Sequence, residues 1–390
     1  MMAKYDFDTV VDRRKTGSLK WDVKENELPM WVADMDFQTA PEVIEAMQER
    51  LDHGVFGYSI VPEEWEASYQ NWWKERHHLD IDRNWLVFCT GVVPALSSCV
   101  RKLTTPGENV LVQTPVYNIF FNSIRNNGRN ILISPLILKG DTYEMDFVDL
   151  EEKLANPQTS LMFLCNPQNP SGRVWDRDTL ARLGELCEKY SVVVISDEIH
   201  CDLTEPGVEY VPFAGVSECC RRNSVTCISA SKAFNMAGLQ SAAVMIPNPT
   251  LRHKVWRALN TDEVAEPNTF AVTSTVAAFE QGGDWLDALR VYLAENREFV
   301  RNFLQKEIPE LRLIGGRATY LLWLDARTLA GRLSAGTEKN LAECIREQTG
   351  LYLSDGSEYG SEGFLRMNIA CPKSVLNEGL ERLKRAVNML

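Results

Sequence analysis

Residues 161–200 read LMFLCNPQNPSGRVWDRDTLARLGELCEKYSVVVISDEIH, and this stretch decides the fold class of the chain. It begins with an apolar run over 161–165 and ends with a second one over 192–196. An amphipathic pattern over 176–190 lies between them, and Asp176 is a typical helix N-cap. Apolar runs this short and continuous are typical of strands buried on both faces of a parallel sheet. The stretch therefore predicts a strand–helix–strand unit of an α/β domain.

Similar runs elsewhere extend the pattern to a mainly parallel, seven-stranded sheet. The five additional strand candidates are 86–89, 109–113, 130–133, 224–228 and 241–246. Helical patterns over 94–103 and 117–127 separate some of them. This alternation predicts a doubly wound α/β domain.

The last hundred residues change in character. A long amphipathic pattern over 285–306 is followed by strand candidates 319–324 and 364–369, which alternate with helix candidates 338–349 and 373–390. These elements predict a smaller α+β domain. The first forty residues show little periodicity, and we expect them to form an extended arm near the small domain. The expected organisation is an N-terminal arm over 1–45, a large domain over 46–284 and a small domain over 285–390.

Composition and charge exclude several classes of function. The 390 residues carry a net charge of −13, so binding to nucleic-acid phosphates is not expected. Membrane spans need ~18 consecutive apolar residues, and no run is that long. The first residues lack the apolar stretch of a signal peptide. The ten cysteines include no C-x-x-C spacing, so we expect no metal, and scattered thiols favour a reducing cytoplasm.

Polar residues follow several predicted strands, at the edge where open α/β sheets bind ligands. Asn169 lies in a turn with two Asn-Pro pairs, which indicate an extended and rigid backbone. Asp197 is a fixed anion that can hold a cationic ring nitrogen. Lys232, among small hydroxyl residues, can act as an amine nucleophile. Gly91 precedes a helix whose free N–H groups can bind a phosphate.

Taken singly, each residue has an ordinary explanation: a turn, a helix cap, a surface lysine, a glycine that opens a helix. Together they fit one ligand that carries a phosphate, an aromatic nitrogen, a ring oxygen and an aldehyde. Pyridoxal phosphate has all four groups. The sequence therefore predicts a pyridoxal phosphate site at the carboxyl edge of the sheet.

Three motifs in this region resemble those of fold-type I, aspartate-aminotransferase-like enzymes in their order and spacing. They are Asn169-Pro170-x-Gly172, Asp197-Glu198-Ile199-His200 and Ser229-x-Ser231-Lys232-x-Phe234-Asn235. The similarity runs from the N-terminal arm to Arg366. Within that superfamily, the segments WVADMDF (31–37) and HGVFGY (53–58) look like the MalY/PatB branch of cystathionine β-lyases and related carbon–sulfur lyases. The resemblance implies the fold of that family, pyridoxal 5'-phosphate as cofactor and a small amino-acid substrate.

The resemblance also implies a role for each matching residue at the reacting end of the cofactor. Lys232 matches the Schiff-base lysine, which is also the catalytic base. Asp197 matches the partner of the pyridinium nitrogen, and Asn169 the donor to the ring oxygen. Tyr117 matches the aromatic residue that stacks on the ring. Arg366 matches the arginine that binds the substrate carboxylate, which Asn169 helps to orient.

The phosphate end is matched by backbone and hydroxyl groups. Gly91, Val92, Ser229 and Ser231 match the phosphate cradle. Tyr58 matches a residue that reaches the phosphate from a neighbouring subunit, which implies a homodimer.

Two positions depart from the typical aminotransferase pattern. His200 stands where those enzymes have a tyrosine, and we expect it either at the cofactor ring or as a satisfied core histidine. Gln240 stands where they have an arginine that binds the phosphate. Both departures also fit the lyase branch.

The resemblance implies α,β-elimination of L-cystathionine or a related cysteine S-conjugate to pyruvate, ammonia and a thiol. The closest alternative is an aminotransferase that exchanges amino and keto acids at the same site. A third is a regulatory protein without catalysis, although an intact Lys232 argues against it. The substrate side-chain pocket is not identifiable from the sequence; Trp31, Met35 and Tyr320 are candidates for its wall, each also a candidate for the core.

Overall fold

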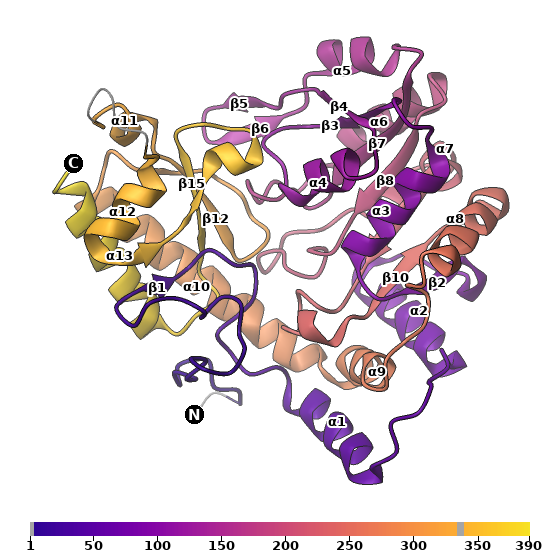
Figure 1. Ribbon diagram of the computed structural model, residues 1–390, viewed down its shortest axis with the longest axis horizontal. Helices are drawn as coiled ribbons and strands as arrows, with labels where there is room; N and C mark the ends of the chain where they lie inside the picture. Colours follow the sequence, from indigo (N-terminus) through magenta and orange to yellow (C-terminus); the bar gives the residue numbers. More distant parts are fainter. Residues whose placement is uncertain (1–3, 334–338) are drawn as a thin grey trace.

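The computed structural model describes residues 4–333 and 339–390. Its elements are built around a seven-stranded sheet and a four-stranded sheet. In Figure 1 the larger sheet lies on the right, and the smaller sheet lies on the left with the yellow C-terminal helices. The long helix α10 (Gly283–Glu307) runs between the two regions. This arrangement leaves the carboxyl edge of the larger sheet close to the smaller one.

The larger sheet has the strand order β2-β10-β9-β8-β7-β3-β4. Its strands are β2 (Leu86–Cys89), β3 (Asn109–Val112), β4 (Asn130–Ile133), β7 (Thr159–Cys165), β8 (Val193–Asp197), β9 (Ser224–Ile228) and β10 (Ala242–Met245). The pairs from β4 to β9 are parallel, and β10 is antiparallel to both neighbours. The predicted mainly parallel, seven-stranded α/β sheet is therefore confirmed, and each strand lies within two residues of its expected bounds.

Helices cover both faces of this sheet. They are α1 (Pro41–His53), α2 (Glu63–His77), α3 (Val92–Leu103), α4 (Ile119–Arg125), α5 (Phe147–Leu154), α6 (Arg177–Lys189), α7 (Glu218–Arg222), α8 (Pro249–Thr261) and α9 (Ala271–Gln281). Along β7, Leu161 and Phe163 join the core formed with α3, α4 and α8, whereas Met162 and Leu164 join the core formed with α5 and α6. Alternate residues are thus buried on opposite faces, which explains the unbroken apolar run.

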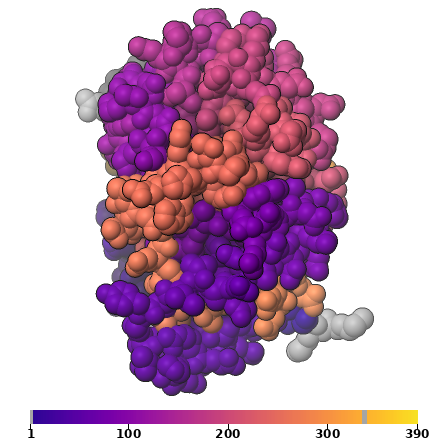
Figure 2. Space-filling view, turned by 90° about the vertical axis from the view of Figure 1, so that its right-hand side faces the viewer, coloured from indigo at the N-terminus to yellow at the C-terminus, as the bar shows by residue number. Residues whose placement is uncertain are grey.

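Figure 2 shows the side of the molecule formed by the N-terminal helices and the α8–α9 segment. The orange α8–α9 segment lies across this side, between an indigo to purple region and the magenta region. Helix α9 packs against α1 and α2, and α8 packs against α3. Helices α1, α2, α5, α7, α8 and α9 were not predicted from the sequence. No helix in the described part of the chain is long and apolar enough to cross a membrane.

The smaller sheet is antiparallel, in the order β11-β12-β15-β14. Its strands are β11 (Arg312–Leu313), β12 (Leu321–Asp325), β14 (Ser354–Asp355) and β15 (Phe364–Asn368). The helices α11 (Arg327–Ala330), α12 (Leu341–Thr349) and α13 (Lys373–Val387) belong to the same region, and a hairpin of β5 (Ile137–Lys139) and β6 (Thr142–Glu144) lies elsewhere. The expected helix 338–349 begins at Leu341, after the Asn340 cap, and Glu338 lies outside the described residues.

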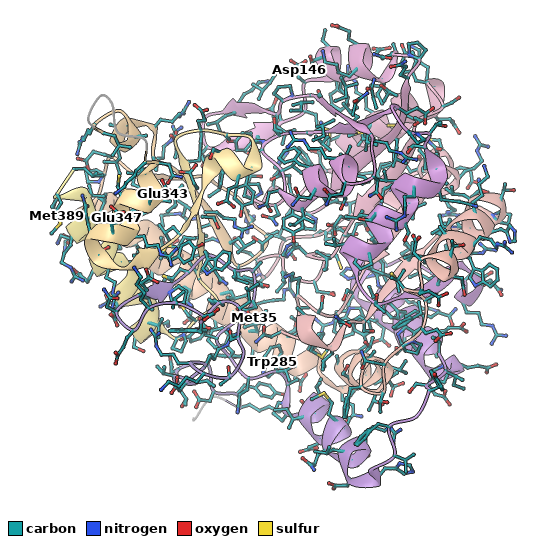
Figure 3. All side chains as sticks on the ribbon, viewed as in Figure 1. Met35, Asp146, Trp285, Glu343, Glu347 and Met389 are labelled. Carbon is teal, nitrogen blue, oxygen red and sulfur yellow. The ribbon has the colours of Figure 1, made fainter. Side chains whose placement is uncertain are left out.

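The N-terminal arm packs against the smaller sheet, as expected. Its strand β1 (Leu28–Pro29) pairs in parallel with β13 (Leu351–Tyr352), and the Asn368 N–H donates to the Met30 carbonyl at 2.8 Å. Figure 3 labels Met35 near the centre of the molecule, where the arm passes between the two sheets. The boundaries expected after residues 45 and 284 stay predictions.

Candidate active site

The predicted polar residues converge at the carboxyl ends of β7, β8 and β9. A cavity of about 200 Å³ opens there. Its lining includes nine residues discussed from the sequence: Gly91, Val92, Tyr117, Asn169, Asp197, His200, Ser231, Lys232 and Gln240. The parallel strands bring them together, because their carboxyl ends meet at one edge of the sheet.

Lys232 lies in the loop after β9, and its amine points to the N-terminal arm. Its Nζ donates a hydrogen bond of 2.6 Å to the Ala33 carbonyl. Burial lowers the pKa of this amine to about 8, against a raising effect of the Asp34 and Asp197 carboxylates. A lowered pKa means that more of the amine is neutral at any given pH, so Lys232 is a better base and nucleophile than a surface lysine.

We therefore expect Lys232 to titrate with a midpoint near 8 in the cofactor-free protein, because burial penalises its charged form. Carbon-13 NMR of reductively methylated protein follows each lysine through its own pH titration. The signal of Lys232 is identified by its loss in a Lys232→Ala variant. The unperturbed lysine side chain of a model peptide serves as the reference, and a Lys232 midpoint equal to it would contradict the expectation.

Asp197 ends β8 and is 5% exposed. Its Oδ1 accepts a hydrogen bond of 3.2 Å from the Ile199 N–H. Burial raises the pKa of this carboxyl to about 6, while the Ile199 N–H and Lys232 lower it. One backbone donor compensates poorly for the hydration that a buried carboxylate loses. A cationic group that entered the cavity would therefore stabilise the Asp197 carboxylate.

His200 follows in the same loop, and its ring lies 6.2 Å from the Tyr320 ring in an edge-on contact. Burial, with Lys232 and Arg366 nearby, lowers the pKa of the imidazole to about 3, so the ring is neutral. Its Nδ1 is buried without a partner among the described residues. His200 therefore lines the cavity, and its role at a cofactor ring stays a prediction.

The helix α3 presents its N-terminus to the cavity. It begins at Val92, with Gly91 as an N-cap that supplies no side chain, so the N–H groups of its first turn are not capped by a side chain. The Gly91 backbone is extended, with φ of 174°, and a Cβ there would make a tight contact of 3.2 Å with Pro94 Cδ. The helix starts two residues before the expected Pro94 because Pro94 fits within the first turn.

The two predicted phosphate serines have different surroundings. Ser231 lines the cavity, and its backbone N–H donates to Ser229 Oγ at 3.0 Å. Ser229 is 4% exposed, and its hydroxyl donates to the Ser241 carbonyl at 2.6 Å. The Ser229 hydroxyl therefore stabilises the loop that carries Ser231. Ser231, Ser241 and Gln240 line the cavity.

Asn169 and Arg366 form the side of the site that faces the smaller sheet. Arg366, on β15, donates from one guanidinium nitrogen to Asn169 Oδ1 at 3.3 Å and from the other to the Trp31 carbonyl at 2.8 Å. Its Nε is buried without a partner among the described residues. The guanidinium lies 4.7 Å from the centre of the Tyr359 ring. These contacts fix the guanidinium beside the turn after β7.

That turn is held against the smaller sheet by close backbone contact. Gly172 has a φ of +71°, and a Cβ there would lie 2.7 Å from the Ala318 carbonyl. A Cβ at Gly316 would lie 1.9 Å from the Ser171 carbonyl. Glycine is required at both positions, and the Arg317 and Ala318 N–H groups donate to the Gly172 carbonyl at 2.9 and 3.1 Å.

The candidates for the substrate pocket, Trp31, Met35 and Tyr320, are not among the residues that line the cavity, but Tyr320 shares a hydrogen-bond acceptor with Lys232. Its hydroxyl donates to the Ala33 carbonyl at 2.9 Å, the same oxygen that Lys232 uses. Met35 is fully buried and belongs to the hydrophobic core. Trp31 stacks on Tyr352 at 4.8 Å between ring centres. The sequence analysis did not anticipate the Ala33 carbonyl, because a backbone acceptor 199 residues from its donor leaves no local signal.

Tyr58 lies away from this cavity, in the connection between α1 and α2. Its side chain is fully exposed, and Val55, Phe56 and Ile60 in the same connection are more than half exposed. The role expected for Tyr58 concerns a second subunit and stays a prediction.

One group of metal-ligating side chains occurs in residues 4–333 and 339–390, namely His77, Cys201 and Asp202. Asp202 Oδ1 already lies 2.9 Å from both His77 Nε2 and Trp72 Nε1, so hydrogen bonding accounts for this carboxylate. The expectation of no metal stays a prediction.

The sequence of this chain matches the model of a known protein family. The model of the family "Aminotransferase class I and II" matches residues 26–383, which is most of the chain. The chain belongs to the aminotransferase class I and II family. The expected family resemblance is thus confirmed.

Several proteins are similar in sequence to this chain over nearly its whole length. Cystathionine beta-lyase PatB of Bacillus subtilis is 42% identical, over 98% of this chain and 100% of its own. Protein MalY of Escherichia coli is 37% identical, over 98% and 99%. The structure of cystalysin from Treponema denticola, which contains a pyridoxal 5'-phosphate cofactor, is 33% identical and superposes with a TM-score of 0.93 over 99% of both chains.

Proposed function

We propose that this protein is a pyridoxal-phosphate-dependent carbon–sulfur β-lyase that acts on L-cystathionine or a related cysteine S-conjugate. The observation that carries the proposal is the position of Lys232, whose amine has a pKa lowered by burial and lies in the same cavity as the buried Asp197 carboxylate. Full-length similarity to proteins named cystathionine beta-lyase supports the choice of reaction.

The cavity residues fit the cofactor group by group. The uncapped first turn of α3, with Gly91, Val92 and Ser231, suits a phosphate. Asp197 is a carboxylate short of donors and suits a protonated ring nitrogen. The orphaned Nδ1 of His200 is a further polar group left for the cofactor.

The remaining groups suit the ring and its oxygen. Asn169 offers an amide whose Oδ1 is already engaged by Arg366, which leaves its NH₂ to donate to an oxygen. Tyr117 is a half-buried aromatic residue on the cavity wall that suits stacking on a ring. Ser229 contributes indirectly, by holding the Ser231 loop in place.

When bound, pyridoxal phosphate supplies an aldehyde that takes up the substrate amine and a ring that withdraws electrons from Cα. Arg366 binds the substrate carboxylate through its fork of N–H donors, and Asn169 helps to orient it. The Lys232 amine, whose lowered pKa gives it a larger neutral fraction than a surface lysine has, takes the proton from Cα. The Cα electrons then expel the sulfur from Cβ, and the remaining fragment yields pyruvate and ammonia.

The test of the function is pyruvate release from L-cystathionine by protein loaded with pyridoxal phosphate, without any keto acid. Sustained release with equimolar homocysteine supports β-elimination. Amino transfer that stops after one turnover, and resumes only when a keto acid is added, would contradict it and favour an aminotransferase.

We further propose a homodimer in which Tyr58 of each subunit completes the site of the other. Its full exposure, with an exposed apolar connection around it, supports this arrangement. We expect Tyr58→Ala and Lys232→Ala each to impair activity, and a refolded equal mixture of the two to recover about one quarter of wild-type activity, since half of the dimers carry one intact site. The measurement is pyruvate release by the mixture; recovery no greater than the sum of the separate variants would contradict shared sites.

The expected cytoplasmic location is also a proposal. All ten cysteines are free thiols in the structure, which supports a reducing compartment.

A further inference from the structure

The Ala33 carbonyl receives two donors, and the second of them has no role in the mechanism above. Lys232 Nζ donates to this oxygen at 2.6 Å and the Tyr320 hydroxyl at 2.9 Å. The two donors come from different regions, the loop after β9 and the residue just before β12. A single acceptor therefore keeps a phenol proton next to the amine that serves as the base.

Tyr320 is not among the residues that line the cavity, but its hydroxyl is hydrogen-bonded to the carbonyl of Ala33, which does line it. The side chain is 1% exposed, and its ring meets the His200 ring edge-on. Asp34, Arg366 and Tyr117 all act electrostatically on the phenol, and burial raises its pKa well above the usual value. The phenol consequently keeps its proton at neutral pH. The Gly172–Ala318 backbone contact fixes the segment that leads to Tyr320.

β-Elimination of a thioether needs not only removal of the Cα proton but also delivery of a proton to the departing sulfur. When the Cβ–S bond breaks, its electron pair goes to sulfur, and an alkyl thiolate is a poor leaving group because the pKa of its thiol is about 8.5 or higher. Lys232 cannot both take the Cα proton and be the first donor to sulfur without passing that proton across the substrate. A second acid beside the lysine removes this difficulty.

We propose that Tyr320 donates its hydroxyl proton to the departing sulfur. This inference rests on the proposed β-lyase function and adds a catalytic residue to it. The Cβ–S bond breaks, the S–H bond forms with the phenol proton, and the phenolate then takes the proton that Lys232 removed from Cα. The exchange returns both side chains to their starting states and needs no further reactant.

The experiment compares two leaving groups in a Tyr320→Phe variant. L-Cystathionine releases an alkyl thiol, whereas β-chloro-L-alanine releases chloride, which needs no proton. We expect kcat with L-cystathionine to fall about 100-fold or more, the usual effect of losing a general acid. We expect kcat with β-chloro-L-alanine to stay within about threefold of wild type, because Cα proton removal is unchanged.

Two further measurements separate acid catalysis from a structural role. Exchange of the Cα proton of L-alanine into deuterated water, followed by NMR, and the absorbance of the bound cofactor against pH should both match the wild type in Tyr320→Phe. Slowed exchange or a shifted absorbance titration would mean that Tyr320 only positions Lys232 through Ala33, and would overturn the proposal.

A Tyr117→Phe variant is the matched comparison, since Tyr117 is a phenol that lines the cavity itself. If the dependence on the leaving group appears in Tyr117→Phe and not in Tyr320→Phe, Tyr117 is the acid and the proposal is wrong. Equal losses on both substrates in Tyr320→Phe would also overturn it. Failure of the wild-type protein to release pyruvate from either substrate would instead contradict the β-lyase function itself, and the proposal with it.

Discussion

Replacing Lys232 by alanine is expected to lower pyruvate release from L-cystathionine by about 10³-fold or more, since the change removes both the covalent anchor and the base. The fold should persist. The Ala33 carbonyl keeps Tyr320 as a donor, and the change removes a buried amine whose burial is costly. The measurements are kcat from pyruvate release and the melting temperature of the cofactor-free protein.

A matched control for this prediction is Lys189→Ala, because Lys189 is an exposed lysine at the end of α6 that pairs with Glu151. Its activity should equal that of the wild type. Added methylamine should restore part of the lost activity of Lys232→Ala, since a small amine can replace the missing base. Activity of Lys232→Ala within a factor of ten of wild type would remove Lys232 from the proposed role.

The second large effect is expected from Arg366→Lys. The change keeps the positive charge but removes the fork that reaches both Asn169 and the Trp31 carbonyl. A lysine has one nitrogen and cannot keep these contacts while binding a carboxylate in two places. Losing a partner of a buried charge pair costs about 2–5 kcal/mol, so kcat/KM should fall by roughly 30- to 5,000-fold, mainly through KM.

The control for Arg366→Lys is Arg312→Lys, on an outer strand of the same sheet, where the exposed guanidinium pairs with Asp325. Its kinetic constants should not change. The loss in Arg366→Lys should also be specific for the carboxylate: binding of an amine analogue that lacks the carboxylate should be equal in wild type and variant. An equal loss for both ligands would show that Arg366 supports the structure and does not bind the substrate carboxylate.

Much of the larger sheet was predictable because its strands are short, apolar and buried on both faces. Leu161 and Met162 point to opposite faces, yet both are in a core, so the run is apolar without interruption. The helices α1 and α2 were missed. Helix α2 has the aromatic residues Trp65, Tyr69, Trp72 and Trp73 on its buried side. Many charged residues lie between them, so the apolar pattern of the helix is weak.

The part of the candidate site that was predictable consists of residues that directly follow predicted strands. Asn169, Asp197 and Lys232 each follow a strand, and parallel strands bring their ends together. The contacts that set the state of Lys232 were not predictable. The Ala33 carbonyl and Tyr320 come from the arm and from the smaller sheet, and only the packing of the two regions brings them to the lysine.

Two residues that donate hydrogen bonds to the arm between Met30 and Phe37 are synthesised near the end of the chain. Trp31 is made early, but Arg366, which donates to its carbonyl, follows 335 residues later. At ~5–20 residues per second, the ribosome needs roughly 20–70 s to make that stretch. Asn368, which donates to the carbonyls on both sides of Ala33, is made later still. A nascent chain therefore carries the lysine, the aspartate and the helix that binds phosphate well before the arm can close over them. The site becomes complete only with the last strand of the protein.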